Sequence, residues 1–369
     1  MTRMSSKLAA VAALSALSLA ACSSATTTAT GASSAAVSAS GPTLACPAGS
    51  ITGEGSTAQT NAIQQIIAAY NDACKNKAKI EYNATGSGAG VKNFNAGLVD
   101  FGGSDSALAT TEQATALTRC KNNAAWDLPL VVGPVAFSYN LKGVSKLVLN
   151  GDVLAKIFMG QITTWNDPAI AALNSGVTLP TTAITVFYRS DDSGTTDNVS
   201  KYLKATAPTV WTPDHSKTWK GKGGEGKTGS AGVAQAVTAT DGAIGYLEWG
   251  FATDNKLGIA QLDTGNGGVE LNADSVGKAL EAAKITGTGN DLTLQLDYAT
   301  KAAGAYPAIL VTYEIVCSAG LDSAKTAIVK DFLTYFASDA GQNSLSDVGS
   351  APLPASLRAK VNTSIQAIK

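Results

Sequence analysis

Residues 184–203, ITVFYRSDDSGTTDNVSKYL, run from an apolar segment through a polar turn into a helix-like pattern. The β-branched and aromatic residues at 184–188 predict a buried strand, and Arg189 follows it directly. The Ser-Gly-Thr at 193–195 then opens a segment whose apolar residues are spaced as on one helical face: Val199, Tyr202 and Leu203. The stretch therefore predicts a strand, a turn and a helix, which is the repeating unit of α/β folds.

Two further stretches repeat this strand–turn–helix design. In SITGEGSTAQTNAIQQIIAAY (50–70), a short strand turns through glycines into a helix with Ile63, Ile66, Ile67 and Tyr70 on one face. In IEYNATGSGAGVKNFNAGLVDFGGSD (80–105), a strand leads through a glycine-rich turn into a short helix with Val91, Phe94 and Leu98 on one face. The two stretches place Ser56, Thr57 and Ser87 at the starts of helices.

The three predicted helix starts could together form a site for a small anion. A helix N-terminus offers unpaired backbone N–H groups and a partial positive charge, and a neighbouring hydroxyl adds a donor. Arg189 would supply the only full positive charge. For any one start, an ordinary helix cap is the simpler explanation of its Ser or Thr. Three starts of one layout, one of them led by an arginine, favour a shared site.

Asp105, which ends the segment DFGGSD, has two explanations. Its carboxylate could accept a hydrogen bond from the proton of HPO₄²⁻ or H₂PO₄⁻. Sulfate has no proton near neutral pH, so the same carboxylate would oppose sulfate at a cost of roughly several kcal/mol in a dry site. Alternatively, Asp105 caps a helix that begins at Ser106. The residues alone favour neither explanation.

Five motifs follow one another along the chain in a recognisable order. They are TGEGST (52–57), GSGAGVKNFNAGLVDFGGSD (86–105), LNGDVLAKIFMGQITTWNDPAIAALN (149–174), YRSDDSGTT (188–196) and GAIGYLEW (242–249). Together they resemble the PstS-type phosphate-binding subunit of bacterial phosphate ABC transporters, in the lipoprotein form found in actinobacteria. The resemblance extends from about residue 51 to the C-terminus.

The resemblance implies a two-lobed α/β fold of the periplasmic-binding-protein type II, with the ligand in the interdomain cleft and two crossover strands as the hinge. By motif position it implies these phosphate ligands: Ser56, Thr57, Ala58 through its backbone N–H, Ser87, Asp105 as acceptor of the phosphate proton, Arg189, Ser193, Gly194 and Thr195. Asp191 is expected to brace the guanidinium of Arg189 from behind. This chain has Ala58 where many relatives have Phe and Asp192 where many have Gly; Asp192 is expected to point to solvent.

Two long apolar runs, LPLVVGPVAFSYNL (128–141) and YPAILVTYEIV (306–316), are suited to carrying the chain between two domains. We expect residues 46–132 together with 313–369 to form domain I. We expect residues 133–312 to form domain II. Two strands that cross between the domains would act as a hinge for closure around the ligand.

The N-terminus, MTRMSSKLAAVAALSALSLAACSS, predicts an export signal over residues 1–21 because its apolar run is too short to span a bilayer. LAAC (19–22) resembles a lipobox, which implies cleavage before Cys22 and acylation of its thiol; an ordinary signal peptide cut nearby is the alternative. Residues 22–45, nearly all Ser, Ala, Thr and Gly, predict a flexible tether. We expect a protein anchored by lipid to the outer face of the cytoplasmic membrane.

Charge and cysteine content narrow the possibilities further. Loss of the signal removes Arg3 and Lys7, so 25 basic residues face 28 acidic ones and the net charge is −3, which does not predict nucleic-acid binding. Four cysteines after Cys22 allow three disulfide pairings, of which we favour Cys74–Cys120 and Cys46–Cys317. With one histidine, His215, and no C-x-x-C, we expect neither a metal site nor a cofactor.

GKGGEGKT (221–228) matches the phosphate-loop pattern G-x-x-x-x-G-K-[ST] of nucleotide-binding proteins. A polar segment, WTPDHSKTWK, stands before it where that pattern needs a buried strand. Gly229, Ser230 and Gly232 follow it, so we expect any helix to start late, near VAQAV (233–237). We interpret residues 221–230 as a glycine-rich surface loop.

The function that the resemblance implies is high-affinity extracytoplasmic binding of inorganic phosphate by a monomer, followed by delivery to the membrane permease of a phosphate ABC transporter. An enzyme is not expected, because no G-x-S-x-G occurs and His215 lies far from Ser193 in the sequence. Two alternatives stay open: a binding protein for another tetrahedral oxyanion, and a surface lipoprotein with an adhesin or signalling role outside transport.

Overall fold

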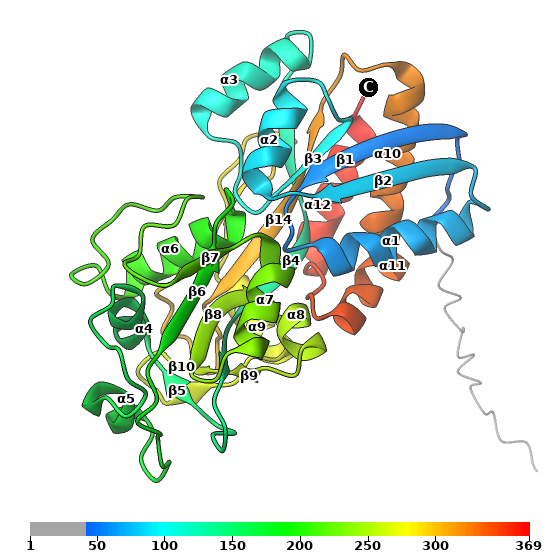
Figure 1. Cartoon of the computed structure of the whole chain (residues 1–369). Helices are drawn as coiled ribbons and strands as arrows, with labels where there is room; N and C mark the ends of the chain where they lie inside the picture. The colour runs from blue at the N-terminus through cyan, green and yellow to red at the C-terminus, as the bar shows by residue number, and fades with distance from the viewer. Residues whose placement is uncertain (1–41) are drawn as a thin grey trace, which may run out of the picture. The chain divides into compact units, whose positions relative to one another are not determined.

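The main sheet of this mixed α/β protein runs β2-β1-β3-β14-β4-β8-β6-β7, with β9 paired to β4 (Figure 1). The computed structural model describes residues 42–369. The strands of this sheet are β1 (Gly49–Gly55), β2 (Ala78–Ala84), β3 (Phe101–Ser104), β4 (Ala125–Asn140), β6 (Thr185–Arg189), β7 (Glu225–Lys227), β8 (Ala243–Glu248), β9 (Gly258–Ile259) and β14 (Ile309–Cys317). The expected α/β fold class is confirmed.

Helices and short strands complete the described chain. The helices are α1 (Thr60–Ala73), α2 (Ser87–Asn95), α3 (Thr110–Arg119), α4 (Gly151–Phe158), α5 (Pro168–Leu173), α6 (Gly194–Thr206), α7 (Gly229–Ala239), α8 (Trp249–Asp254), α9 (Ala273–Glu281), α10 (Ser323–Phe336), α11 (Asp339–Ser344) and α12 (Ala355–Ala367), with a 3₁₀ turn, η1 (Leu345–Val348). One small sheet joins β5 (Val148–Leu149), β10 (Gln261–Asp263) and β11 (Gly268–Val269), and another joins β12 (Lys284–Ile285) and β13 (Leu294–Gln295).

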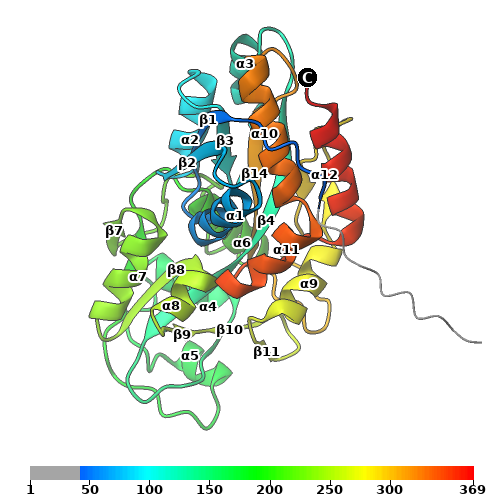
Figure 2. The same cartoon turned by 90° about the vertical axis from the view of Figure 1, so that its right-hand side faces the viewer.

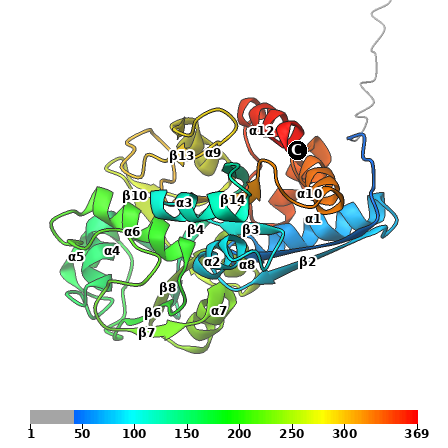
Figure 3. The same ribbon diagram turned by 90° about the horizontal axis from the view of Figure 1, so that it is seen from above.

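The order of the strands explains where the helices lie. β1 is parallel to β2 and β3, and β6 is parallel to β7 and β8. Parallel neighbours need a crossover connection, which α1, α2, α6 and α7 provide. Figure 3 shows α1 beside α10, and Figure 2 shows α10, α11 and α12 grouped together, in line with the contacts between these helices. Each parallel group of strands is therefore covered by helices that start at the strands' carboxyl ends.

The two central strands, β4 and β14, are antiparallel to each other and to their outer neighbours β8 and β3. Both are buried along almost their whole length. β4 packs residues 128–132 into the apolar core around α1 and α10, and residues 135–139 into the core around α4, α6 and β8. The two apolar runs in the sequence thus form the strands that link the two cores, as predicted.

The predicted disulfide pairing is wrong. The structure joins Cys46 to Cys74 and Cys120 to Cys317, with Cα–Cα distances of 5.2 and 5.3 Å. Cys120 follows α3, close to the start of β4, and β4 pairs its first residue, Ala125, with Cys317. The fold of the sheet thus decides the second pair, which the spacing of cysteines does not reveal.

The segment before β1 decides the first pair. Asp331 of α10 accepts hydrogen bonds from the backbone N–H groups of Ala45 (2.8 Å) and Cys46 (3.0 Å). Tyr70 of α1 donates to the same carboxylate at 2.8 Å. These bonds hold Cys46 beside Cys74, at the end of α1.

Residues 1–41, which include Cys22, the predicted signal at 1–21 and most of the predicted tether at 22–45, lie outside the described residues. Within the described part, Leu44 already packs against the core around α1 and α10. None of the helices between residues 42 and 369 combines the length and apolar character that a membrane span requires. The described residues, 42–369, fall within one unit, and the boundaries of domain I (46–132 and 313–369) and domain II (133–312) stay a prediction.

Candidate anion-binding site

The candidate site lies where strands of the main sheet end and helices begin. β1 ends at Gly55, β3 at Ser104 and β6 at Arg189, and the polar residues singled out in the sequence follow these ends. The carboxyl ends of parallel strands are the usual place for a ligand in α/β sheets. Four helices, α1, α2, α6 and α7, start here and bring the N–H groups of their first turns with them.

Three contacts show that the helix starts converge. The N–H of Gly88, in the first turn of α2, donates to the carbonyl of Asp192, just before α6, at 2.9 Å. A Cβ atom placed on Gly194, the first residue of α6, would lie 2.4 Å from Ser87 Oγ. The hydroxyls of Thr57, before α1, and Ser230, in α7, lie 3.1 Å apart. The predicted convergence of three helix starts is therefore present, and α7 adds a fourth.

Asp105 is the acceptor around which the first group of hydroxyls gathers. Ser56 Oγ donates to its Oδ1 at 2.6 Å, and Thr312 Oγ1 donates to the same oxygen at 2.7 Å. Ser87 Oγ donates to Oδ2 at 3.1 Å. The side chain is buried, with 3% of its surface exposed. The carboxylate is thus held by three donors from three different parts of the chain.

Burial also changes the chemistry of Asp105. It raises the pKa of this carboxyl to about 6, although the hydroxyl donors Ser56 and Thr312 pull the pKa down. The charge of Glu248 raises the pKa further, and the bond from Ser87 lowers it. Near neutral pH the group is therefore mostly ionised and able to accept a proton from a ligand, yet it is close to its own titration.

Arg189 forms the second group. Its guanidinium is buried, with Nε donating to Asp191 Oδ1 at 2.8 Å and Nη2 paired with Asp191 Oδ2. Nη1 donates to Thr195 Oγ1 at 3.3 Å and to Ser230 Oγ at 3.2 Å. Asp191 also accepts from the N–H of Gly229 at 3.0 Å. The expectation that Asp191 braces the guanidinium agrees with this geometry, and Nη1 is directed at the hydroxyls of two helix starts.

The ion pair controls the charge of both partners. Burial acts to lower the pKa of Arg189, but the hydrogen bonds and charge of Asp191 outweigh burial and raise it. Burial likewise acts to raise the pKa of Asp191, and Arg189 outweighs it and holds this pKa below its ordinary value. Both groups therefore stay charged near neutral pH.

The structure shows which of the predicted site residues cap a helix and which do not. Ser193 is the N-cap of α6 and accepts from the N–H of Thr196 at 3.2 Å, so the cap explanation accounts for its hydroxyl. The cap explanation for Asp105 is wrong, because the next helix begins at Thr110 and not at Ser106. The N–H of Ala58 donates to Ser56 Oγ at 3.0 Å, at the edge of the Asp105 group.

Asp192, the departure from the family pattern, is exposed, as expected. Its Oδ1 accepts from the hydroxyl of Thr218 at 2.8 Å. The carboxylate of Asp192 therefore has a hydrogen-bond partner at the protein surface.

Sequence reasoning missed three polar residues of this site. Ser230 contacts Arg189 and Thr57, Thr312 donates to Asp105, and Glu248 accepts from the hydroxyl of Thr195 at 2.7 Å. Thr312 and Glu248 stand in apolar strand segments, where a polar side chain is itself a signal.

The interpretation of GKGGEGKT needs a correction. β7 occupies residues 225–227 and α7 begins at Gly229, directly after the motif and not near residue 233 as expected. The strand lies inside the motif, so the segment does not form the loop between strand and helix that surrounds a nucleotide phosphate. The motif instead leads α7, and with it Ser230, to the anion site.

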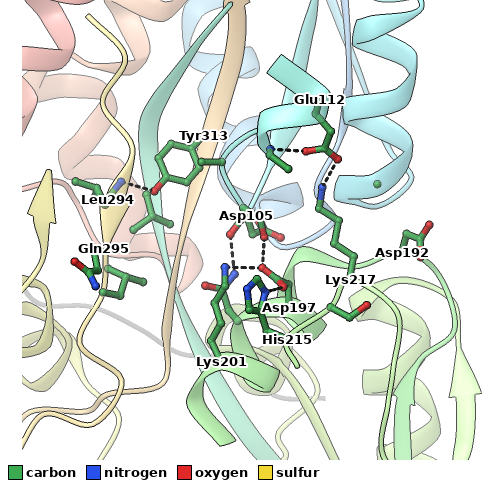
Figure 4. Close-up of a pocket in the computed structure, with 18 of the residues that line it drawn as sticks. Asp105, Glu112, Asp192, Asp197, Lys201, His215, Lys217, Leu294, Gln295 and Tyr313 are labelled. Atoms are coloured by element: carbon green, nitrogen blue, oxygen red, sulfur yellow. Dashed lines mark hydrogen bonds and ion pairs between the residues drawn. The ribbon is translucent and has the colours of Figure 1, made fainter. Parts of the chain in front are cut away.

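A cleft with a volume of about 1150 Å³ opens beside Asp105 (Figure 4). On its α6 side, Asp197 accepts from Ser106 Oγ at 2.6 Å and contacts Lys201 Nζ and His215 Nδ1, each at 2.6 Å. Across from it, Lys217 reaches Glu112 of α3 at 3.2 Å. Tyr298, Tyr313 and Leu294 line the apolar side. Among Asp105, Arg189 and the residues that contact them through the hydrogen bonds above, Asp105 alone lines this cleft.

The fold and the site define a class of protein, a binding protein in which helix N-termini, hydroxyls and one buried arginine surround a small anion. A model of the PBP superfamily domain matches residues 24–340. The chain belongs to this superfamily and, within it, to the PstS family of phosphate-binding proteins.

Three similar proteins support this assignment. Phosphate-binding protein PstS 3 of Mycobacterium leprae is 45% identical over 323 residues, covering 86% of this chain and 87% of that protein. PstS 2 of Mycobacterium tuberculosis is 46% identical over 320 residues, covering 85% and 86%. The solved structure of PfluDING, a high-affinity periplasmic phosphate-binding protein with bound phosphate, has a TM-score of 0.71 and 26% identity and covers 85% of this chain and 93% of its own.

Proposed function

We propose that this protein binds inorganic phosphate outside the cytoplasm. The observation that carries the proposal is the arrangement around Asp105 and Arg189, in which a buried carboxylate and a buried guanidinium stand among the hydroxyls and N–H groups of four helix starts. The ligands we propose are Ser56, Thr57, Ala58, Ser87, Asp105, Arg189, Gly194 and Thr195, with Ser193 at the cap of α6. We add Ser230, because its hydroxyl accepts from the same guanidinium nitrogen as that of Thr195.

The choice of phosphate rests on the acceptor. A site made only of donors and one guanidinium would take any tetrahedral oxyanion. A buried carboxylate that is mostly ionised near pH 7 rejects an anion without a proton, since the two like charges face each other with no water between them. The carboxylate accepts the P–OH of HPO₄²⁻ or H₂PO₄⁻, so phosphate offers Asp105 a donor that sulfate does not have. This argument favours phosphate over sulfate.

Titration of the purified protein with phosphate and with sulfate by isothermal calorimetry at several pH values tests the proposal. We expect tight binding of phosphate and binding of sulfate at least a hundredfold weaker, which corresponds to about 3 kcal/mol. Equal affinity for the two anions would leave only the alternative of a general oxyanion-binding protein. Competition with arsenate, which carries a comparable proton, shows how far the size and shape of the anion contribute to selectivity.

The geometry gives no support for an enzyme. His215 contacts Asp197, and the hydroxyl of Ser193 caps α6, so among the described residues these two do not form a nucleophile–base pair. Incubation with a chromogenic phosphate ester should release no product. A turnover that depends on Ser193 would contradict the assignment as a binding protein.

We propose further that the protein is a lipid-anchored monomer that delivers phosphate to the permease of an ABC transporter. The support is membership of the PstS family together with the sequence pattern that ends at Cys22. Cells that lack this protein should take up labelled phosphate more slowly, and wild-type protein should restore uptake. A Cys22→Ala variant should lose palmitate labelling and leave the membrane fraction. If uptake stays normal without the protein, the alternative of a surface lipoprotein outside transport gains support.

A further inference from the structure

Glu314 is a buried acid that the proposed binding mechanism does not use. It lies in β14 with no exposed surface, and neither oxygen of its carboxyl has a hydrogen-bond partner among residues 42–369. A charged carboxylate without a donor is one of the most unfavourable arrangements in a protein interior. A neutral carboxylic acid in the same place needs far less compensation.

The surroundings of Glu314 can be read from the sheet register. Glu314 pairs with Gly103 of β3 on one side and with the apolar Leu128 of β4 on the other. A Cβ atom on Gly103 would lie 2.3 Å from Tyr82 Oη and 2.6 Å from Gln59 Nε2. The absence of a side chain at Gly103 therefore lets Tyr82 of β2 and Gln59 of α1's N-cap approach the strand next to Glu314.

A chain of hydrogen bonds leads from this place to the anion site. Gln59 Nε2 donates to Tyr82 Oη at 3.0 Å, and Tyr82 donates to the carbonyl of Ser56 at 2.9 Å. The hydroxyl of Ser56 in turn donates to Asp105. Because the single proton of Tyr82 is used on Ser56, its oxygen must accept from Gln59, which fixes the orientation of the Gln59 carboxamide.

That orientation leaves a second atom without a partner. The buried Gln59 Oε1 has no donor among the described residues, just like the two oxygens of Glu314. A protonated carboxyl and a carboxamide are complementary, since the acid O–H donates to the amide oxygen and the amide N–H donates to the acid carbonyl. A proton on Glu314 would thus satisfy acceptors on both side chains.

Glu314 is also linked to Asp105 through its own strand. Thr312, two residues earlier and on the same face of β14, donates to Asp105 Oδ1 at 2.7 Å. The charge of Asp105 acts on Glu314. The titratable groups that face Glu314 are therefore Asp105, after β3, and Tyr82 of β2, while Gln59 and Leu128 are neutral.

We propose that Glu314 is a positioning residue of the anion site that works as a neutral acid: paired with Gln59, it supports the loop that carries Ser56, and its ionisation in alkaline solution weakens anion binding. The inference rests on the proposed phosphate binding. A negative charge on Glu314 adds to that of Asp105 behind the bound anion, and it also breaks the acid–amide pair. Both effects raise the Kd for phosphate.

The titration range follows from the environment. Burial raises the pKa of Glu314 to about 8, the neighbouring carboxamide of Gln59 lowers it, and the charge of Asp105 raises it. Asp127 in β4 has a pKa raised to about 8 as well, by burial first and then by the charge of Asp291. It accepts from the N–H of Leu108 and from Gln113, outside the Gln59–Tyr82–Ser56 chain. Asp127 is therefore the matched control.

The test compares how the Kd for phosphate changes with pH in three proteins. Calorimetry at pH 6.5 and 9.5 gives the ratio of the two Kd values for wild type, Glu314→Gln and Asp127→Asn. We expect the ratio to be on the order of tenfold smaller in Glu314→Gln than in wild type, the size expected for removing one nearby like charge at an effective dielectric of about 20. Asp127→Asn should keep the wild-type ratio. Titration of free phosphate is common to all three proteins and cancels.

Two outcomes overturn the inference: equal ratios in wild type and Glu314→Gln, or a ratio that falls only in Asp127→Asn. Should Glu314→Gln not fold, NMR titration of wild-type protein labelled with ¹³C in glutamate carboxyls answers the same question. One glutamate must titrate near pH 8, and titration of every glutamate below pH 6 refutes a neutral Glu314. This measurement needs no ligand, so it stays decisive if phosphate does not bind, which would refute the proposed function instead.

Discussion

At the scale of single residues, Arg189 and Asp191 show how the site keeps a charge away from water. Arg189 is 2% exposed, and Asp191 accepts from its Nε and Nη2 atoms. Nη1 is therefore left to donate to the hydroxyls at the neighbouring helix starts. Because Asp191 already offsets the charge of the guanidinium, an anion in the proposed site would rest largely on the dipoles of the helix N-termini. The charge of the site is therefore shared between one residue pair and several backbone dipoles.

We predict that Arg189→Ala raises the Kd for phosphate at least a hundredfold, about 3 kcal/mol or more. The reason is that Asp191 then stays beside the anion without its counter-charge. Calorimetry with phosphate measures the loss. Arg358→Ala is the matched control, since Arg358 lies in α12, where it pairs with Asp339 of α11. Near-normal affinity in Arg189→Ala would refute the role that we give to the guanidinium.

Asp105→Asn should narrow the preference for phosphate over sulfate. The Asn amide can donate to an oxygen without a proton, so the repulsion that excludes sulfate disappears while the shape of the side chain is kept. We expect the ratio of the two Kd values to fall by at least tenfold, about 1.4 kcal/mol. An unchanged ratio in competition experiments would show that Asp105 does not accept the phosphate proton.

The ionisation of Asp105 also makes the folded protein, in the closed arrangement described, less stable above pH 6 than below pH 4. Its pKa is raised in the folded state to about 6, from 3.8. Its stabilising effect is therefore complete below pH 4 and is lost as the pH rises through 6, by up to about 3 kcal/mol. Denaturant unfolding gives the free energy of unfolding of Asp105→Asn relative to wild type. This difference should shift in favour of Asp105→Asn by an amount of this order between pH 4 and pH 8. A constant difference between the two proteins at both pH values would contradict the raised pKa.

At the scale of elements, the site depends on how closely helix starts can approach each other. Gly194 begins α6, and a Cβ atom there would lie 2.4 Å from Ser87 Oγ and 2.6 Å from Asp105 Oδ2. Its backbone is not in the left-handed region, so alanine would suit the helix itself. The glycine is thus required by the neighbouring helix start and by the acceptor, not by its own conformation.

We therefore predict that Gly194→Ala weakens phosphate binding by about tenfold or more without lowering helix stability, because α6 must move away from Ser87 and Asp105. Gly277→Ala, in α9, is the control: no atom lies within 4 Å of the added Cβ, so binding should be unchanged and stability should rise by up to about 1 kcal/mol. Calorimetry and thermal unfolding report the two effects separately. Equal affinities of the two variants would show that the approach of α6 to Asp105 is not needed.

Most elements that build the site could be predicted from the sequence. The helix starts at Ser87 and Gly194 and the two apolar runs that form β4 and β14 are local patterns. The start of α7 was missed because Gly229 and Gly232 are poor helix formers, and this helix depends on burying Val233 and Val237 against the sheet. A signal was nonetheless present, since Thr-Gly-Ser at 228–230 repeats the hydroxyl–Gly–hydroxyl pattern of Ser-Gly-Thr at 193–195.

Long-range contacts were out of reach for a different reason. The disulfide partners of Cys46 and Cys120 depend on the contact between the N-terminal segment and Asp331 and on the register of β4 and β14. Thr312 reaches Asp105 across 207 positions of sequence. Local patterns carry no information on such distances, so these pairs follow only from the assembled sheet.

At the scale of the whole molecule, two strands connect the two apolar cores, and side chains bridge the cleft beside them. Ser106, which follows β3, donates to Asp197 of α6, and the carbonyl of Asp105 accepts from Asn198 at 2.7 Å. Lys217 pairs with Glu112 of α3 across the same cleft. We propose that these bonds belong to the ligand-bound form. Without the anion, the helix starts on the two sides would present mainly donors and charges to each other, so separation in water would be favoured.

We predict that phosphate closes the cleft by bending β4 and β14 near Gly133 and Ile309. These two residues lie at adjacent rungs of the ladder between the two strands. Small-angle X-ray scattering should give a smaller radius of gyration with saturating phosphate than without it, and sulfate at the same concentration should leave the radius unchanged. Arg189→Ala with phosphate serves as the control for a protein that does not bind. The prediction is wrong if scattering is identical with and without phosphate in a sample that calorimetry shows to bind phosphate. The helix starts would then be held together before the anion arrives. In that case the anion would have to enter through the cleft beside Asp105.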